Sequence, residues 1–373
     1  MYFRDVVGQD ELKRQLIEAA NRGFVPHAQM FVESGGAGAF PIALAYARYL
    51  NCTDRRPTDS CGRCPSCHKY DELAHPDLFF VFPMAKRERK KMICDDYMPE
   101  WRAFLSISPY FSFDGWTNHI EVGNTQPIIY SQESEEITRK LSYRIYESEY
   151  RILLIWMPEK MHLTCANKLL KLVEEPSENT LIFMVTDEPD TILGTILSRV
   201  QRINVRAIAA PELAEALVRI ERLDPESARD VARMAEGNYL KAKELISVSD
   251  EHAFFLEQFR EIMRNAWARN IKGMKTQSEK LAQIGRERQK NFLAYCQRLM
   301  RENFIYRFNA PELNYMNRQE ADFAAKFSPH IYEHNVLAIS EELTKAEVHI
   351  AQNVNAKMVF FDMALRITML IRK

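Results

Sequence analysis

Two continuous apolar runs constrain the fold of this chain more than any other feature. The segments YRILLIWM (150–157) and NTLIFMVT (179–186) are apolar at nearly every central position. Strands buried on both faces are typical of a parallel sheet covered by helices. Helical segments such as SEEITRKLSYRIYE (134–147) alternate with strands through residue 205. The sequence therefore predicts an α/β domain with a parallel sheet over residues 1–205.

The pattern becomes wholly helical after residue 206. Three short helices are expected in residues 206–250, with the sequences APELAEALVRIER, DPESARDVARMA and YLKAKELIS. Longer amphipathic helices are expected in residues 251–373, where apolar side chains recur at helical spacing. These changes predict three domains, 1–205, 206–250 and 251–373. A long irregular stretch is expected at 83–125, inside the first of them.

The glycine-rich segment ESGGAGAF (33–40) lies between an expected strand and an expected helix. Glycines let backbone N–H groups approach phosphate, and a working phosphate-binding loop adds a lysine and a magnesium-binding hydroxyl. Aligned with G-x-x-x-x-G-K-[ST], the segment has Glu33 in place of the first glycine, Ala39 in place of the lysine and Phe40 in place of the hydroxyl residue. Its glycines are Gly35, Gly36 and Gly38. The segment alone predicts either a nucleotide site that has lost its lysine and its magnesium-binding hydroxyl, or a glycine-rich turn in an unrelated α/β fold.

The strand ILLIWM bears on the same choice. In enzymes with such a loop, this strand ends in an acid that holds magnesium. Trp156 occupies the place of that acid, and Glu159 follows three residues later. Both halves of a magnesium site are therefore missing together, which favours a domain that kept the fold and lost the reaction. We expect Glu159 to be a surface acid rather than a catalytic base.

Four of the seven cysteines lie within sixteen positions, as Cys52-x8-Cys61-x2-Cys64-x2-Cys67. Four thiolates suit a tetrahedral zinc site, and no ligand position is left open for catalysis. The spacing predicts a structural Zn²⁺ module at 52–67. Reduced thiols or a redox pair are the alternatives, and His68 and His75 are possible substitute ligands.

Residues 166–203 resemble the clamp-loader branch of the AAA+ proteins, in which a helix of the form A-N-x-L-L-K-x-L-E-E-P precedes a strand. A T-I-L-S-R-C-Q motif follows at 195–201, with Val200 in place of the cysteine. The segments FRDVVGQDELKRQLIEA and AQNVNAKMVFFDMALRI are similar to the two ends of the same family. The helix motif is matched by Ala166, Asn167, Leu169, Leu170, Lys171, Glu174, Glu175 and Pro176.

The resemblance implies an architecture and a role. It implies an AAA+ P-loop-type domain with a four-cysteine zinc module, a small helical lid domain (206–250) and an all-α collar domain (251–373). An altered loop beside an intact Ser-Arg motif is similar to the delta-prime type, the non-hydrolysing subunit of the bacterial DNA polymerase III clamp loader. The implied partners are tau/gamma-type ATPase subunits and a delta subunit in a hetero-pentamer, with the sliding clamp and primer-template DNA beyond them.

Within that family the Ser-Arg arginine reaches into a neighbour's ATP site, which assigns the role to Arg199 with Ser198 beside it. A guanidinium supplied in trans can offset charge on the transferring phosphoryl group, and its planar fork stays charged. A surface arginine at the start of a strand is the alternative. On the expected lid, Leu240 stands where AAA+ motors usually carry a phosphate-sensing arginine.

Charge and composition limit the other functions. The formal net charge of −1 gives no case for strong non-specific binding of nucleic acid. KRERKK (86–91) and the aromatic residues after it could contact DNA, but a solvated turn with a small satellite core is the preferred interpretation. No apolar run reaches the length of a membrane span, so we expect a cytoplasmic protein without a membrane partner. An ATP-hydrolysing clamp-loader subunit and a stand-alone zinc-containing DNA-binding protein remain as alternatives.

Overall fold

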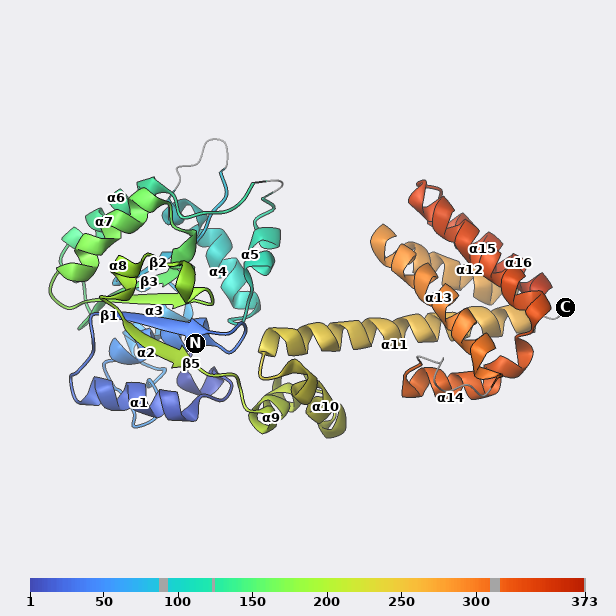
Figure 1. The fold of residues 1–373 in the computed structure, drawn as a ribbon, viewed down its shortest axis with the longest axis horizontal. Helices are drawn as coiled ribbons and strands as arrows, with labels where there is room; N and C mark the ends of the chain where they lie inside the picture. The colour runs from blue at the N-terminus through green and yellow to red at the C-terminus, as the bar shows by residue number, and fades with distance from the viewer. Residues whose placement is uncertain (87–92, 123–124, 309–315, 372–373) are drawn as a thin grey trace. The chain divides into compact units, whose positions relative to one another are not determined.

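A five-stranded parallel sheet organises the N-terminal part of the chain in the computed structural model, which describes residues 1–86, 93–122, 125–308 and 316–371. The chain divides into two compact units, Met1–Ile246 and Ser247–Lys373, each drawn in Figure 1. The division lies within one helix, α11 (Tyr239–Ala268). The domain boundaries at 205/206 and 250/251 stay a prediction.

The sheet has the strand order β2-β3-β4-β1-β5, and every neighbouring pair is parallel. This confirms the parallel α/β class predicted from the apolar runs, since β3 and β4 are buried along their whole length. In β1, Phe31 lies opposite Val185 of β4 and Ile203 of β5. The strands are β1 (Ala28–Glu33), β2 (Leu78–Val81), β3 (Arg151–Trp156), β4 (Thr180–Thr186) and β5 (Gln201–Val205).

Helices cover both faces of the sheet, with α1 and α2 on one side and α6 and α7 on the other (Figure 1). Helix α2 follows the glycine-rich segment and is buried along its whole length, as its run of alanines and large apolar residues predicts. The helices of the α/β part of the chain, apart from those in residues 83–125, are α1 (Asp10–Asn21), α2 (Ala39–Leu50), α3 (Pro65–Asp71), α6 (Ser131–Ser142), α7 (Leu163–Glu174) and α8 (Gly194–Leu197).

Residues 83–125 are not a long irregular stretch, because their described part contains α4 (Met98–Ile107), α5 (Phe113–His119) and a short 3-10 helix at Cys94–Tyr97. Their aromatic side chains also do not form a satellite core. Trp101 is fully buried, stacks on Phe82 at a ring-centroid distance of 4.2 Å and meets Trp116 edge-on at 5.0 Å. These rings belong to the main core of the sheet. Of the basic stretch KRERKK, all but Lys86 lies outside the described residues.

Three further elements complete the first unit: α9 (Ala210–Ile220), α10 (Pro225–Ala235) and the first residues of α11. Their apolar faces share a small cluster with Val7 and Tyr110 of the α/β layer. The segment YLKAKELIS begins α11 rather than forming a short helix of its own, because α11 continues to Ala268.

The second unit is helical throughout its described residues, as the periodicity after residue 251 predicts. Helix α13 packs against α15, and α12 packs against α16, around a common apolar core. No helix in the described part of the chain is long and apolar enough to cross a membrane. The helices after α11 are α12 (Ile271–Ala282), α13 (Arg286–Tyr306), α14 (Arg318–Phe327), α15 (Glu333–Ala351) and α16 (Ala356–Leu370).

Candidate functional site

The glycine-rich loop joins the end of β1 to the start of α2. Gly35, Gly36 and Gly38 adopt φ angles of +59°, +64° and +101°, in the left-handed region that favours glycine. The side chain of Glu33 turns back over this loop, and its Oε2 accepts hydrogen bonds from the backbone N–H groups of Gly38 at 2.7 Å and Ala39 at 3.1 Å. These are first-turn N–H groups of the kind that bind phosphate at other helix N-termini.

The electrostatics of Glu33 reflect two opposing effects. Burial raises the pKa of the Glu33 carboxyl, while the hydrogen bonds from Ala39 and Gly38 act in the opposite direction. The nearby carboxylate of Asp187 adds to the rise of this pKa. The loop thus contains a carboxyl group of its own, placed at the N-terminus of a helix, where negative charge is favoured.

Aromatic rings occupy the two positions at which a working magnesium-nucleotide site would carry its metal ligands. Phe40 and Trp156 are both buried, and the ring of Phe111 lies 4.9 Å from each of them. Trp101 approaches the same two rings at 5.8 and 5.5 Å. The sequence motif identified Phe40 and Trp156, but it gave no sign that Phe111 and Trp101, from the segment between β2 and β3, would pack against them.

Tyr110 closes the other side of the loop. Its hydroxyl accepts a hydrogen bond from the backbone N–H of Val7 at 2.8 Å, and its ring lies tilted against that of Tyr239, with 4.5 Å between the ring centroids. A Cβ atom added at Gly38 would lie 3.0 Å from this ring. The glycine at 38 therefore serves the packing of Tyr110 as well as the turn of the backbone.

A cavity of about 620 Å³ remains beside the loop. Leu240 lies in its wall, where the resemblance leads one to look for an arginine, and the backbone N–H of Tyr239 donates to the carbonyl of Gly36 at 3.0 Å. The start of α11 is thereby fixed to the glycine-rich loop. The polar side chains along the wall belong to Glu33, Ser112, Thr186, Asp187, Asn238, Lys241 and Glu244.

Glu159 is not a surface acid, contrary to the expectation from the sequence. The hydroxyl of Thr186 donates a hydrogen bond to its Oε2 at 2.8 Å, and Oε1 is buried without a hydrogen-bond partner in the described part of the chain. Burial raises the pKa of Glu159 to about 7, against the opposing effect of the Thr186 hydrogen bond. The sequence gave no signal for this, because Thr186 reaches Glu159 only through the pairing of β3 with β4.

Arg199 lies after α8, at the start of β5, and does not line this cavity. Its side chain remains 40% exposed and forms an ion pair with Glu174, with 2.7 Å between Nε and Oε1. Nη1 donates hydrogen bonds to the carbonyl of Thr195 at 2.9 Å and to the hydroxyl of Ser198 at 3.1 Å. The side chains of Ser198 and Arg199, to which the resemblance assigns one function, are thus hydrogen-bonded to each other.

The four cysteines of the predicted metal module come together in space. The Sγ atoms of Cys52, Cys61, Cys64 and Cys67 all lie within 4.8 Å of one another, and all four residues are buried. The Cys61–Cys67 and Cys67–Cys52 sulfur distances are 3.9 and 3.7 Å. A tetrahedral zinc site with Zn–S bonds of about 2.3 Å separates its sulfurs by about 3.8 Å, so these residues fit the metal.

Backbone N–H groups point at the sulfurs as they do around thiolate ligands. Cys61 N–H donates to the Sγ of Cys52 at 3.3 Å, Cys64 N–H to the Sγ of Cys61 at 3.3 Å, and Cys67 N–H to the Sγ of Cys64 at 3.4 Å. The cluster does not include His75, whose Nδ1 instead accepts the N–H of Asp77 at 3.1 Å. The cysteines alone make the compatible donor set.

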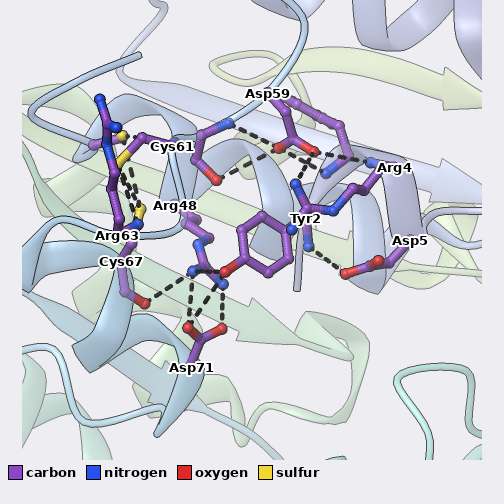
Figure 2. A network of polar contacts seen from close by, with 12 residues as sticks. Tyr2, Arg4, Asp5, Arg48, Asp59, Cys61, Arg63, Cys67 and Asp71 are labelled. Atoms are coloured by element: carbon purple, nitrogen blue, oxygen red, sulfur yellow. Dashed lines mark hydrogen bonds and ion pairs between the residues drawn. The ribbon is translucent and has the colours of Figure 1, made fainter. Parts of the chain in front are cut away.

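A buried arginine of α2 connects the cysteine module to the rest of the unit (Figure 2). The Arg48 guanidinium donates to both carboxylate oxygens of Asp71, to the carbonyl of Cys67 at 3.0 Å and to the hydroxyl of Tyr2. Burial disfavours its charge, but the bonds to Asp71 outweigh burial and raise the pKa of Arg48. Nearby, Asp59 accepts the backbone N–H groups of Phe3 and Arg4. The segment before α1 and the cysteine module are therefore fastened to the helix that follows the glycine-rich loop.

Known proteins resemble large parts of this chain. The DNA polymerase III subunit delta' of Bacillus subtilis (strain 168) is 24% identical over 245 residues, which make up 66% of this chain and 61% of the relative. The subunit tau of Escherichia coli (strain K12) is 22% identical over 254 residues, 67% of this chain and 32% of the relative. The chain thus matches less than two thirds of the length of these relatives.

A solved structure of a DNA polymerase III gamma subunit-related protein from Thermotoga maritima aligns with 98% of this chain and 100% of its own length, at 14% identity and a TM-score of 0.34. A family model described as "DNA polymerase III, delta subunit" matches residues 8–209, which is more than half of the chain. The chain therefore belongs to the DNA polymerase III delta-subunit family of clamp-loader proteins.

Proposed function

We propose that this chain is a clamp-loader subunit that does not hydrolyse ATP and helps to load the sliding clamp onto primed DNA. Its partners would be tau/gamma-type ATPase subunits and a delta subunit in a hetero-pentamer of the DNA polymerase III holoenzyme. The observation that carries the proposal is the contact between the Glu33 carboxylate and the N–H groups of Gly38 and Ala39. A phosphate group would need those same donors.

The neighbouring positions support the same conclusion. Mg-nucleotide needs a lysine for the outer phosphates, and oxygen ligands for the metal. Ala39 cannot supply the first, and the buried rings of Phe40 and Trp156 cannot supply the second. A nucleotide would also have to displace a carboxylate that repels it.

Arg199 is the residue that we assign to a neighbour's ATP. Its side chain is exposed, and the planar fork of a guanidinium suits a phosphate. An arginine finger of this kind is worth roughly 10³- to 10⁵-fold in the rate of nucleotide hydrolysis in other systems. Ser198 would support the guanidinium through its hydroxyl.

The two alternatives are less well supported. An ATP-hydrolysing subunit would need the three missing side chains named above. Base stacking by the aromatic residues that follow KRERKK would need exposed rings, whereas Trp101 and Trp116 are fully buried. The net charge of −1 also gives little electrostatic attraction to DNA.

Two measurements test the proposal. Isothermal titration of the purified chain with Mg-ATP up to millimolar concentration should show no saturable binding, and saturable binding would refute the non-hydrolysing role. In a complex reconstituted with tau/gamma-type and delta subunits, Arg199→Ala should abolish DNA-stimulated ATP hydrolysis at one site. Arg202→Ala, a change of an exposed arginine three residues later, in β5, is the matched control and should leave turnover unaltered.

We assign a structural Zn²⁺ ion to the cysteine module. The four thiolates of Cys52, Cys61, Cys64 and Cys67 would complete its tetrahedral coordination and leave no open position. Bound zinc typically contributes on the order of 10 kcal/mol to the folding of such a module. Elemental analysis should find one zinc per chain. Cys67→Ser should lower this content sharply, while Cys165→Ser, a change of a buried cysteine outside the cluster, should preserve it.

A further inference from the structure

The guanidinium of Arg199 is held unequally at its three nitrogens. Nε pairs with the Glu174 carboxylate at 2.7 Å, and Nη1 donates to Thr195 and Ser198. Nη2 donates no hydrogen bond within the part of the chain that the structure describes. Two of the three guanidinium nitrogens are therefore engaged by the chain itself, and Nη2 remains for another acceptor.

Two helix ends create this arrangement. Glu174 is the last residue of α7, and Pro176 keeps the helix from continuing. Arg199 directly follows Ser198, the C-cap residue of α8. The carbonyl of Thr195 lies in the last turn of α8, where carbonyl groups lack partners within the helix, and it accepts hydrogen bonds from both the Arg199 side chain and the Ser198 hydroxyl.

The ion pair contributes little to stability, which points to a different role. Both side chains are substantially exposed, at 40% for Arg199 and 44% for Glu174. Pairs with such exposure are screened by water and usually add little to folding. Their clearest physical effect is to limit the rotamers of a long, flexible side chain before it meets its target.

We propose that Glu174 is a positioning residue, which orients the Arg199 guanidinium so that Nη2 can meet a phosphate of the ATP bound by an adjacent subunit. This inference rests on the proposed function of Arg199. Glu174 takes Nε and leaves the outer nitrogen, so the ion pair and a phosphate contact can exist together. The arginine then arrives in a defined geometry, and small errors in such geometry lower reaction rates steeply.

The test is DNA-stimulated ATP hydrolysis by the reconstituted complex, with kcat and KM measured separately. Glu174→Ala should lower kcat by roughly 10- to 100-fold while KM for ATP stays unchanged. Glu174→Gln keeps an oxygen in the same place and should recover most of the rate. Glu175→Ala, a change of the adjacent exposed acid, is the matched control and should have no effect.

Three outcomes would overturn the inference: an unchanged or raised kcat in Glu174→Ala, a rise in KM alone, or a Gln variant as slow as the Ala variant. Thermal unfolding and zinc content of Glu174→Ala should match the wild type, and a parallel loss of both would mean a structural role instead. Arg199→Ala belongs in the same experiment. If it loses activity while Glu174→Ala does not, only the positioning role fails; if it is fully active, the proposed function fails as well.

Discussion

The carboxylate of Glu33 accepts a hydrogen bond from the backbone N–H of Gly38 at 2.7 Å, across the turn of the glycine-rich loop. Glu33→Ala removes the acceptor for two N–H groups at the start of α2, but it also removes the cost of burying a carboxylate. We expect a net loss of about 1 kcal/mol in the free energy of unfolding, typical of a lost helix cap. Urea unfolding at pH 7 measures it.

The same variant separates two explanations for the proposed lack of nucleotide binding. Since Ala39 and Phe40 remain, Glu33→Ala should still show no saturable binding of Mg-ATP. Binding gained by this variant would mean that the carboxylate alone closes the site. Glu18→Ala, at an exposed position that pairs with Arg22 on the helix surface, is the control for stability and should change it by less than about 0.5 kcal/mol.

The loop also shows which features a sequence can and cannot predict. The missing lysine and hydroxyl at Ala39 and Phe40 follow from the motif, because its spacing is fixed by the turn itself. The contact of Glu33 with Gly38 does not, since it depends on a side-chain conformation. Phe111 lies 71 positions after Phe40, and apolarity alone says that such a ring is buried without saying against what.

The elements differ in the same way. The strands around Leu154 and Phe183 were predictable, because apolar runs this short are typical of buried strands, whereas buried helices are longer. The length of α11 was not predicted, although no glycine or proline interrupts residues 239–268. A short helix was expected at YLKAKELIS, but α11 continues beyond it to Ala268.

Gly36 offers a test of the contact between the loop and the start of α11. Its φ angle is +64°, and a Cβ atom would lie 2.2 Å from Oδ1 of Asn238 and 3.2 Å from the backbone nitrogen of Leu240. Gly36→Ala should therefore cost about 1–2 kcal/mol for the backbone conformation and roughly 1–3 kcal/mol more for the overlap. Urea unfolding gives the free energy.

A matched glycine, Gly23, separates the cost of the steric overlap from the cost of the backbone conformation. Gly23 has a φ angle of +69°, and a Cβ atom there would have nothing within 4 Å. Gly23→Ala should show the backbone cost alone. Equal losses in the two variants would mean that Asn238 moves aside at no cost, and that the loop is not tightly packed against α11.

Arg48 should be far more important for stability than its exposed counterpart Arg63. The Arg48 side chain is 0% exposed and pairs with Asp71, whereas Arg63 and Asp54 are 73% and 54% exposed. Arg48→Met leaves the buried carbonyl of Cys67 without this donor and removes the ion-pair partner of Asp71, which should cost about 2 kcal/mol. Arg63→Met should cost less than about 1 kcal/mol. Similar values from chemical denaturation of the two variants would contradict the network in Figure 2.

Glu133 gives a prediction about pH. It is completely buried in α6, where its Oε2 accepts the N–H of Cys94 at 2.6 Å and Oε1 has no hydrogen-bond partner among the described residues. Burial raises its pKa from 4.5 to about 7, although the Cys94 hydrogen bond and the Lys140 charge oppose the rise. The folded chain therefore binds this proton more tightly than the unfolded chain does.

The sign of the pH effect follows from this difference. The stabilising contribution of the protonated carboxyl is complete below the unfolded pKa of 4.5 and is lost as the pH rises through about 7. Glu133→Gln cannot ionise, so its stability relative to the wild type should improve by about 2–3 kcal/mol between pH 5 and pH 8. Urea unfolding at the two pH values provides the comparison, and other titrating groups, Glu159 included, cancel in the difference.

Glu135→Gln is the control for this last prediction, because Glu135 lies on the same helix with its side chain 78% exposed and pairs with Lys168 across the surface. Its stability relative to the wild type should not depend on pH by more than about 0.5 kcal/mol. A Glu133→Gln difference that stays constant between pH 5 and pH 8 would mean that the buried carboxyl keeps one protonation state throughout. Water or a further polar group would then have to reach Oε1, and α6 would pack less tightly against Cys94 than the 2.6 Å contact indicates.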